Sequence, residues 1–276
     1  MKVLCIGDVI GRPGREALRS FVGRLRAELG VGFVIANGEN SSGGVGITVQ
    51  SAEDMFGSGV DVITLGNHTW KHDKEIAPYL EKCGRLVRPL NFAPGTPGRG
   101  VCVVEVPGGG GGGGAARVAV MNLIGRVYME PCASPFDAAD AALAELSRTA
   151  PGVPVVVDMH AEASSEKRAM GHHLDGRVAA VFGTHTHVPT ADEEVLPGGT
   201  GYLGDVGMTG PYDSVIGMVK EKIVHKFRSG RPMPYVVARG NVQLRGVVFE
   251  IDGRGKCVAV ERVRRDVTGP VVSEDA

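Results

Sequence analysis

The sequence lacks the features that mark secreted, disulfide-stabilised or membrane-spanning proteins. Its five cysteines are odd in number and include no C-x-x-C pair, which indicates reduced, mostly buried thiols rather than a disulfide framework. The apolar run at residues 3–6 is too short for a signal peptide, and no other stretch is long enough to span a bilayer. These absences favour a cytoplasmic location.

An excess of one charge is also lacking. The chain has 30 basic and 31 acidic residues, a formal net charge of −1 and no long run of either sign. This balance argues against an extended nucleic-acid groove, but it does not argue against a local phosphate site.

The length and apolar content are sufficient for a large core. The 276 residues are 43% hydrophobic, enough for one large domain or two small ones. Because no internal repeat or clear boundary is present, we predict a single domain over residues 1–276. Residues 107–115, which include seven consecutive glycines, are predicted to form the flexible tip of a hairpin, and the tail after about residue 265 is predicted to fray.

Apolar runs alternate with helical patterns along the first third of the chain. They predict strands near residues 2–7, 33–36 and 60–65, a loop at 11–14, and helices near 15–29, 48–57 and 72–82. This alternation favours parallel strands buried on both faces. The later pattern predicts a hairpin of strands 101–106 and 117–123, a helix near 135–147, a strand at 153–158, a helix at 163–172, a strand at 178–182, a Gly- and Thr-rich loop after 207, and two antiparallel strands over 242–264.

Polar side chains with metal-ligand chemistry follow five of the predicted strands. Ligand sites in such folds lie at the carboxyl ends of strands. Oxygen and nitrogen ligands without cysteine suit Mn, Fe, Zn or Co. The set is too large for one ion, but it suits two ions that share a bridging carboxylate. Its members are Asp8, Glu39, Asn40, Asn67, His68, His160, His185 and His187.

The charge of this set indicates the class of ligand. Only Asp8 and Glu39 carry a formal negative charge, so two divalent ions would leave the site at roughly +2. Such a site attracts an anion, and phosphate esters are the commonest candidates. Two-metal sites hold their ions about 3.5–4 Å apart and clamp both the attacking and the leaving oxygen of a phosphoryl group.

Each of these residues also has an ordinary structural interpretation. Asp8 could cap a helix, and His160 could be a hydrogen-bonded core histidine; their placement at consecutive strand ends favours the ligand interpretation. The glycines of residues 7–14 suggest a phosphate loop but lack its G-K-[ST] ending. The remaining histidines lie in helical patterns and are predicted to be surface or packing residues: His72, His172, His173 and His225.

In this order, the strand-end motifs resemble those of the calcineurin-like metallophosphoesterase superfamily. The chain departs from that series where Ile10 replaces a histidine, where Glu39 replaces an aspartate, and where Thr69 replaces an acid. These departures are similar to the YmdB-like branch, whose members are phosphodiesterases on 2′,3′-cyclic nucleotides. The resemblance runs from residue 1 to about 265, and its motifs are Gly7-Asp8, Gly38-Glu39-Asn40, Gly66-Asn67-His68, His160 and Gly183-Thr184-His185-Thr186-His187.

The resemblance implies a fold and a set of roles. The fold would be an α/β four-layer αββα sandwich, with two mixed central sheets flanked by helices. Asp8, Glu39, Asn40 and His187 would hold a first metal, while Glu39 as the bridge, Asn67, His160 and His185 would hold a second. Iron or manganese is expected, with zinc as an alternative. A metal-bridging hydroxide would attack phosphorus in line, and His68 would act as general acid.

The expected activity is therefore hydrolysis of a small phosphodiester, in particular a 2′,3′-cyclic nucleotide. Two alternatives stay open at this point: a phosphomonoesterase acting on nucleotides or phosphoproteins, and a regulator that senses a nucleotide without turnover. The resemblance is also compatible with a homo-oligomer.

Overall fold

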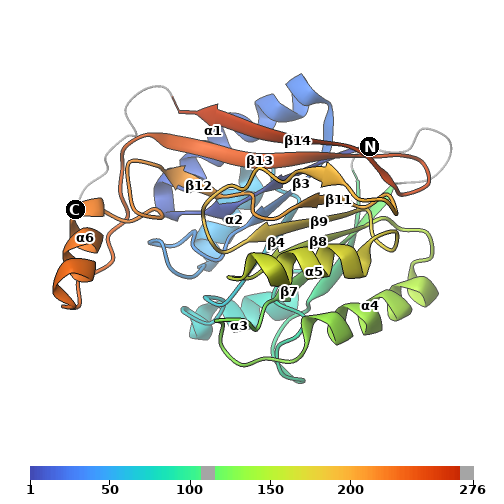
Figure 1. The fold of residues 1–276 in the computed structure, drawn as a ribbon, viewed down its shortest axis with the longest axis horizontal. Coiled ribbons are helices and arrows are strands. Elements are labelled where there is room, and N and C mark those ends of the chain that lie inside the picture. The colour runs from blue at the N-terminus through green and yellow to red at the C-terminus, as the bar shows by residue number, and fades with distance from the viewer. Residues whose placement is uncertain (107–115, 268–276) are drawn as a thin grey trace.

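The apolar residues of the first strand, β1 (Lys2–Ile6), pack on two different sides. Val3 and Cys5 belong to a cluster between two sheets, whereas Leu4 and Ile6 belong to a cluster beneath helices. This is the consequence of the two-residue period of a strand buried on both faces. The computed structural model describes residues 1–106 and 116–267, and it shows two sheets packed face to face with helices outside them (Figure 1).

The first sheet has the order β2-β12-β13-β1-β3-β4-β5, and β14 pairs with β13. Its strands β1, β3, β4 and β5 are parallel, while β13 runs antiparallel to β1. The remaining strands of this sheet are β2 (Asp8–Val9), β3 (Val31–Asn37), β4 (Val62–Thr64), β5 (Leu86–Val87), β12 (Met208–Pro211), β13 (Val242–Ile251) and β14 (Cys257–Asp266).

The second sheet has the order β10-β11-β9-β8-β7-β6. Strands β7, β8, β9 and β11 are parallel, and the two edge strands β6 and β10 are antiparallel to their neighbours. The strands are β6 (Val101–Glu105), β7 (Arg117–Ile124), β8 (Val155–His160), β9 (Ala180–Thr184), β10 (Glu194–Val195) and β11 (Gly201–Leu203).

Helices cover the outer face of each sheet, so the predicted αββα class is confirmed. On the first sheet lie α1 (Gly11–Leu29), α2 (Val49–Gly57) and α3 (Asp73–Lys82). On the second lie α4 (Pro135–Thr149) and α5 (Ser164–Leu174). A further helix, α6 (Lys220–Ser229), lies at one end of the molecule and buries Ile223 (Figure 1). No helix in the described ranges is long and apolar enough to cross a bilayer.

Two sequence expectations about local structure were wrong. Residues 11–14 form the first turn of α1 rather than a loop, because a first turn leaves its N–H groups unbonded and therefore tolerates Pro13. The Gly- and Thr-rich stretch after Gly207 contains β12, whose pairing with β2 and β13 is non-local. Strand β14 ends at Asp266, close to the expected start of the tail at about residue 265. The glycine tip at 107–115 and residues 268–276 lie outside the described residues.

Candidate metal centre

The eight residues singled out in the sequence converge on the carboxyl ends of strands from both sheets. Asp8 lies in β2, with one residue between it and β1, while Glu39 and Asn40 follow β3, and Asn67 and His68 follow β4. From the second sheet, His160 is the last residue of β8, and His185 and His187 follow β9. Every one of the eight contacts another member of the set.

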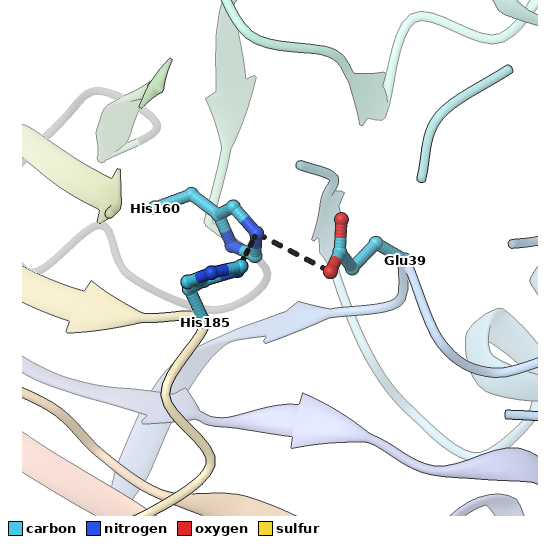
Figure 2. Close-up of side chains that lie close together, drawn as sticks. All are labelled: Glu39, His160 and His185. Atoms are coloured by element: carbon cyan, nitrogen blue, oxygen red, sulfur yellow. Dashed lines mark hydrogen bonds and ion pairs between the residues drawn. The ribbon is translucent and has the colours of Figure 1, made fainter. Parts of the chain in front are cut away.

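Glu39, His160 and His185 form the centre of this cluster (Figure 2). The His160 Nε2 atom lies 3.2 Å from Glu39 Oε1, 3.1 Å from His185 Nδ1 and 3.0 Å from Asn67 Oδ1. Nε2 cannot form good hydrogen bonds to all three atoms at once, because an imidazole nitrogen carries at most one proton. One donor atom from each of Glu39, His160 and His185 lies within 4.8 Å of the others, so a cation can be bound by all three.

A second group of donors lies beside the first. Asp8 is fully buried, and its Oδ1 atom has no hydrogen-bond partner among the described residues. This oxygen is 3.8 Å from His187 Nε2, which also contacts the Asn40 amide nitrogen at 3.2 Å. The other ring nitrogen of His187, Nδ1, lies 3.0 Å from the Ile216 carbonyl and donates to it. That bond directs the Nε2 lone pair toward Asp8 and Asn40, which is the arrangement a metal-binding histidine needs.

His68 lies at the edge of the cluster and contacts one residue of each donor group, Glu39 and Asn40. Its backbone N–H donates to Glu39 Oε2 at 3.0 Å, and its Nδ1 lies 2.7 Å from Asn40 Oδ1. Because the Nδ1–H group is engaged by the amide oxygen, the Nε2 atom is the one left to act on another molecule. The side chain is 29% exposed, so that nitrogen can reach a bound substrate.

The electrostatics of the centre favour a cation. Burial alone would raise the pKa of Glu39, but His160 and His68 outweigh it and hold the pKa well below its usual range. Burial alone would lower the pKa of His160, but Glu39 and Asp8 outweigh it and raise that pKa to about 9. Burial and the neighbouring His160 lower the pKa of His185 to about 3. Without a metal, the His160 ring is therefore favoured to carry a proton beside Glu39, and a metal ion bound there would compete with that proton.

A buried polar network behind His160 was not recognised in the sequence. The Nδ1 atom of His160 donates to the Thr184 hydroxyl at 2.9 Å, and that hydroxyl donates to Asp158 Oδ1 at 2.6 Å. Asn37 and Thr64 donate to the other carboxylate oxygen of Asp158. These bonds set the His160 tautomer, so that Nε2 faces Glu39. The only signal was the spacing of Asp158 and His160, which places both on one face of a strand.

The loop that carries the paired histidines has an unusual backbone. Both His185 (φ 96°) and His187 (φ 65°) have positive φ, which costs a residue other than glycine about 1–3 kcal/mol. Between them, the Thr186 N–H and hydroxyl donate to Asp205 Oδ2 at 3.2 and 2.8 Å. Glu162, a residue the sequence interpretation missed, lies 3.2 Å from His185 Nε2. The loop conformation is therefore maintained by carboxylates outside the predicted set.

Gly66 permits the close approach of the two sheets at this point. A Cβ atom on Gly66 would lie 2.2 Å from His160 Nε2 and 2.3 Å from Glu39 Oε2, far inside van der Waals contact. The other predicted histidines lie elsewhere. His172, His173 and His225 are in helices as expected, whereas His72 is the residue before α3.

The fold and the donor set together define a two-sheet α/β protein with a candidate metal centre between its sheets. The model of the YmdB-like protein family matches residues 4–263. A Bacillus subtilis protein named 2′,3′-cyclic-nucleotide 2′-phosphodiesterase is 45% identical over 264 residues, which cover 95% of this chain and 96% of that protein. The chain therefore belongs to the YmdB-like family.

Two crystal structures have the same fold. A hypothetical protein from Thermus thermophilus is 41% identical with a TM-score of 0.87, and the match covers 96% of this chain and 99% of that one. A protein described as a novel phosphatase from Mycoplasma pneumoniae is 34% identical with a TM-score of 0.87, over 96% of this chain and 93% of that one.

Proposed function

We propose that this protein is a metal-dependent phosphodiesterase that hydrolyses 2′,3′-cyclic nucleotides. The observation that carries the proposal is the convergence of Glu39, His160 and His185 donor atoms within 4.8 Å of one another. The name of the Bacillus subtilis relative supplies the substrate class. The anion-attracting charge of a loaded centre agrees with it, because only Asp8 and Glu39 are acidic in the set.

The residues present fit a pair of metal ions. Asp8 Oδ1 is a buried carboxylate oxygen without a hydrogen-bond partner among the described residues, and such an atom is costly unless a cation is bound. Donors of mixed oxygen and nitrogen type, without sulfur, suit iron or manganese, and also zinc. In the proposed assignment Asp8, Asn40 and His187 would hold one ion, Asn67, His160 and His185 would hold the other, and Glu39 would contribute to both. When bound, the ions would polarise the phosphoryl group and acidify a bound water.

The protein's own contribution to the reaction is orientation and proton transfer. In this proposal His68 delivers a proton from Nε2 to the leaving ribose oxygen, and the contact of its Nδ1 with Asn40 supports that role. Imidazole is the side chain suited to proton transfer near neutral pH. Thr184 and Asp158 orient His160 through its Nδ1 atom, and the Ile216 carbonyl orients His187.

Elemental analysis combined with a substrate panel tests this function. Protein purified without added metal should contain close to two transition-metal ions per chain. It should hydrolyse bis-(p-nitrophenyl) phosphate faster than the mono-ester, and 2′,3′-cyclic AMP faster than 3′,5′-cyclic AMP. A strong preference for the mono-ester would make the protein a phosphomonoesterase. Tight binding of 2′,3′-cyclic AMP to the metal-loaded protein without turnover would make it a nucleotide-sensing regulator.

The proposal also covers the cellular location and the assembly state of the protein. All five cysteines are free thiols, which supports the cytoplasmic location expected from the sequence. The family resemblance is compatible with a homo-oligomer, and light scattering of the purified protein measures its assembly state directly.

A further inference from the structure

A two-residue hairpin turn lies directly against the ring of His187. The residues on either side of the turn, Val215 and Met218, are joined by two backbone hydrogen bonds, in which each N–H donates to the carbonyl of the other at 2.9 and 3.0 Å. The turn itself consists of Ile216 and Gly217. The Ile216 carbonyl accepts the hydrogen bond from His187 Nδ1 at 3.0 Å, so the turn borders the candidate metal centre.

The first residue of this turn is one that the backbone disfavours. Ile216 and Gly217 both have positive φ, 47° and 98°, as the two central residues of a type I′ turn do, and such turns prefer Asn-Gly. A β-branched residue at positive φ is a genuine outlier, because its side chain crowds the backbone. Backbone strain of this kind is concentrated at functional sites.

The turn is held in place independently of the isoleucine side chain. The Gly217 N–H donates to Ser214 Oγ, and the Gly217 carbonyl accepts a hydrogen bond from the Ala238 N–H, both at 2.9 Å. A Cβ atom on Gly217 would lie 2.9 Å from Cγ2 of the buried Ile10. Because the carbonyl of residue 216 belongs to the backbone, an asparagine at this position would present it equally well. The isoleucine side chain therefore needs another explanation.

The strained side chain is not buried in the core. Ile216 is 51% exposed, and Val188, the residue directly after His187, is 59% exposed. We call these two residues the apolar rim. A single exposed aliphatic residue is ordinary, but two of them beside a polar centre suit the apolar part of a ligand, since small-molecule sites combine apolar walls with a few polar groups.

The hydrogen bonds of Asn40 relate the apolar rim to His68. The Asn40 amide nitrogen lies 3.2 Å from His187 Nε2, and its oxygen lies 2.7 Å from His68 Nδ1. In the proposed function His68 protonates the leaving ribose oxygen, which puts the ribose on this side of the centre. The base is attached to that ribose directly, so the rim beside His187 is within its reach.

We propose that the apolar rim packs against the nucleobase of the cyclic nucleotide and gives the enzyme its preference for nucleotides over other cyclic phosphodiesters. This inference rests on the proposed function. The metal centre accounts for binding of the phosphate, and the rim accounts for binding of the base. The flat face of a base is largely apolar, and its contact with aliphatic side chains removes apolar surface from water on both sides.

Steady-state hydrolysis of two cyclic phosphodiesters tests the proposal. One is 2′,3′-cyclic AMP, and the other is glycerol 1,2-cyclic phosphate, which has the same five-membered cyclic phosphate but no base. Ile216→Asn removes the apolar side chain and keeps a residue that tolerates positive φ. Val188→Thr replaces one methyl group by a hydroxyl. Ile216→Leu keeps an apolar side chain and serves as the conservative variant.

Val258→Asn is the matched control. Val258 is also an aliphatic β-branched residue and is 56% exposed. Its neighbour Ala259 pairs with Glu250, which pairs with Lys2 at the start of β1, whereas the candidate centre lies at the carboxyl ends of the strands. Elemental analysis and circular dichroism check that every variant retains the metal content and the fold of the wild-type protein.

The wild-type protein should have a higher kcat/KM for 2′,3′-cyclic AMP than for the glycerol ester. Ile216→Asn should lose about tenfold in kcat/KM for the nucleotide, mostly through KM, and stay within about twofold of wild type on the glycerol ester. Val188→Thr should lose activity on the nucleotide alone. Ile216→Leu should stay within about threefold of wild type on both substrates, and Val258→Asn should match wild type.

The outcomes separate the two proposals. Equal losses on both substrates, or loss of metal from Ile216→Asn, would overturn the rim proposal while the phosphodiesterase function stands, because the side chain would then act through His187. No loss on the nucleotide would overturn it as well. Equal losses together with a lower mass of Ile216→Asn in light scattering would assign the rim to a contact between copies of this chain. Hydrolysis of neither substrate by the metal-loaded wild-type protein would refute the function itself, and the rim proposal with it.

Discussion

The ammonium of Lys167 lies 2.6 Å from Asp205 Oδ2, and both residues are almost completely buried. Lys167 comes from α5, while Asp205 follows β11. The same carboxylate accepts two hydrogen bonds from Thr186, between the two histidines of positive φ. A charge pair in the interior therefore supports the backbone that presents His185 and His187.

Removing the lysine should destabilise the protein strongly. Lys167→Met leaves Asp205 buried without its partner, which generally costs about 3–5 kcal/mol of unfolding free energy. Urea unfolding of the metal-free protein measures the loss. Lys220→Met is the control, because its pair with Asp213 is exposed and exposed pairs contribute little. Equal stability of the two variants would show that Lys167 is not needed to hold the loop.

Replacing the shared carboxylate should empty the centre. Among the described residues, Glu39 is the one carboxylate that contacts both His160 and His68, so Glu39→Gln should lower metal affinity and activity by about 100-fold or more. Glu162→Gln is the graded comparison, since Glu162 is half exposed and contacts only the outer nitrogen of His185. It should keep its metal and lose less activity. A Glu39→Gln protein with normal metal content would rule out the bridging role.

Removing His68 should separate metal binding from catalysis. His68→Ala should keep both ions, and its kcat should fall by about 10²–10⁴-fold, the usual contribution of a general acid. The loss should be smallest for bis-(p-nitrophenyl) phosphate, because p-nitrophenolate leaves without protonation. His173→Ala, which changes a surface histidine paired with Asp140, should behave as wild type. If metal is lost with His68, the residue is a ligand instead.

A methyl group at Gly66 should disrupt the centre sterically. Gly66→Ala places Cβ within 2.3 Å of both His160 Nε2 and Glu39 Oε2. Overpacking of this kind costs about 1–3 kcal/mol, and the displaced side chains should no longer retain metal. Gly57→Ala is the control, because a Cβ there meets nothing within 4 Å. Thermal unfolding and elemental analysis of both variants test this, and retention of two ions by Gly66→Ala would contradict it.

The candidate centre was predictable because its residues stand in local patterns. Asp8, Glu39, Asn67 and His185 each follow an apolar run, and the carboxyl ends of parallel strands meet at one edge of a sheet. The residues behind them were not predictable in this way. Asp158 lies inside a strand and Lys167 inside a helix. The local sequence around each residue does not indicate which distant residue it contacts. Asp158 contacts Thr64 across 94 residues, and Lys167 contacts Asp205 across 38.

The sequence by itself determined the strand–helix alternation, because the apolar period of each segment is a local property of the chain. It also determined the chemistry of the donors, since the donor residues stand at or shortly after the ends of such segments. Only the tertiary structure decided that β13 separates β1 from β12, and that two sheets bring Glu39 against His160. Those contacts depend on burial and pairing between segments far apart in the chain. The contact of α1 with residues 235–239 is of the same kind, because these segments meet only in the folded protein.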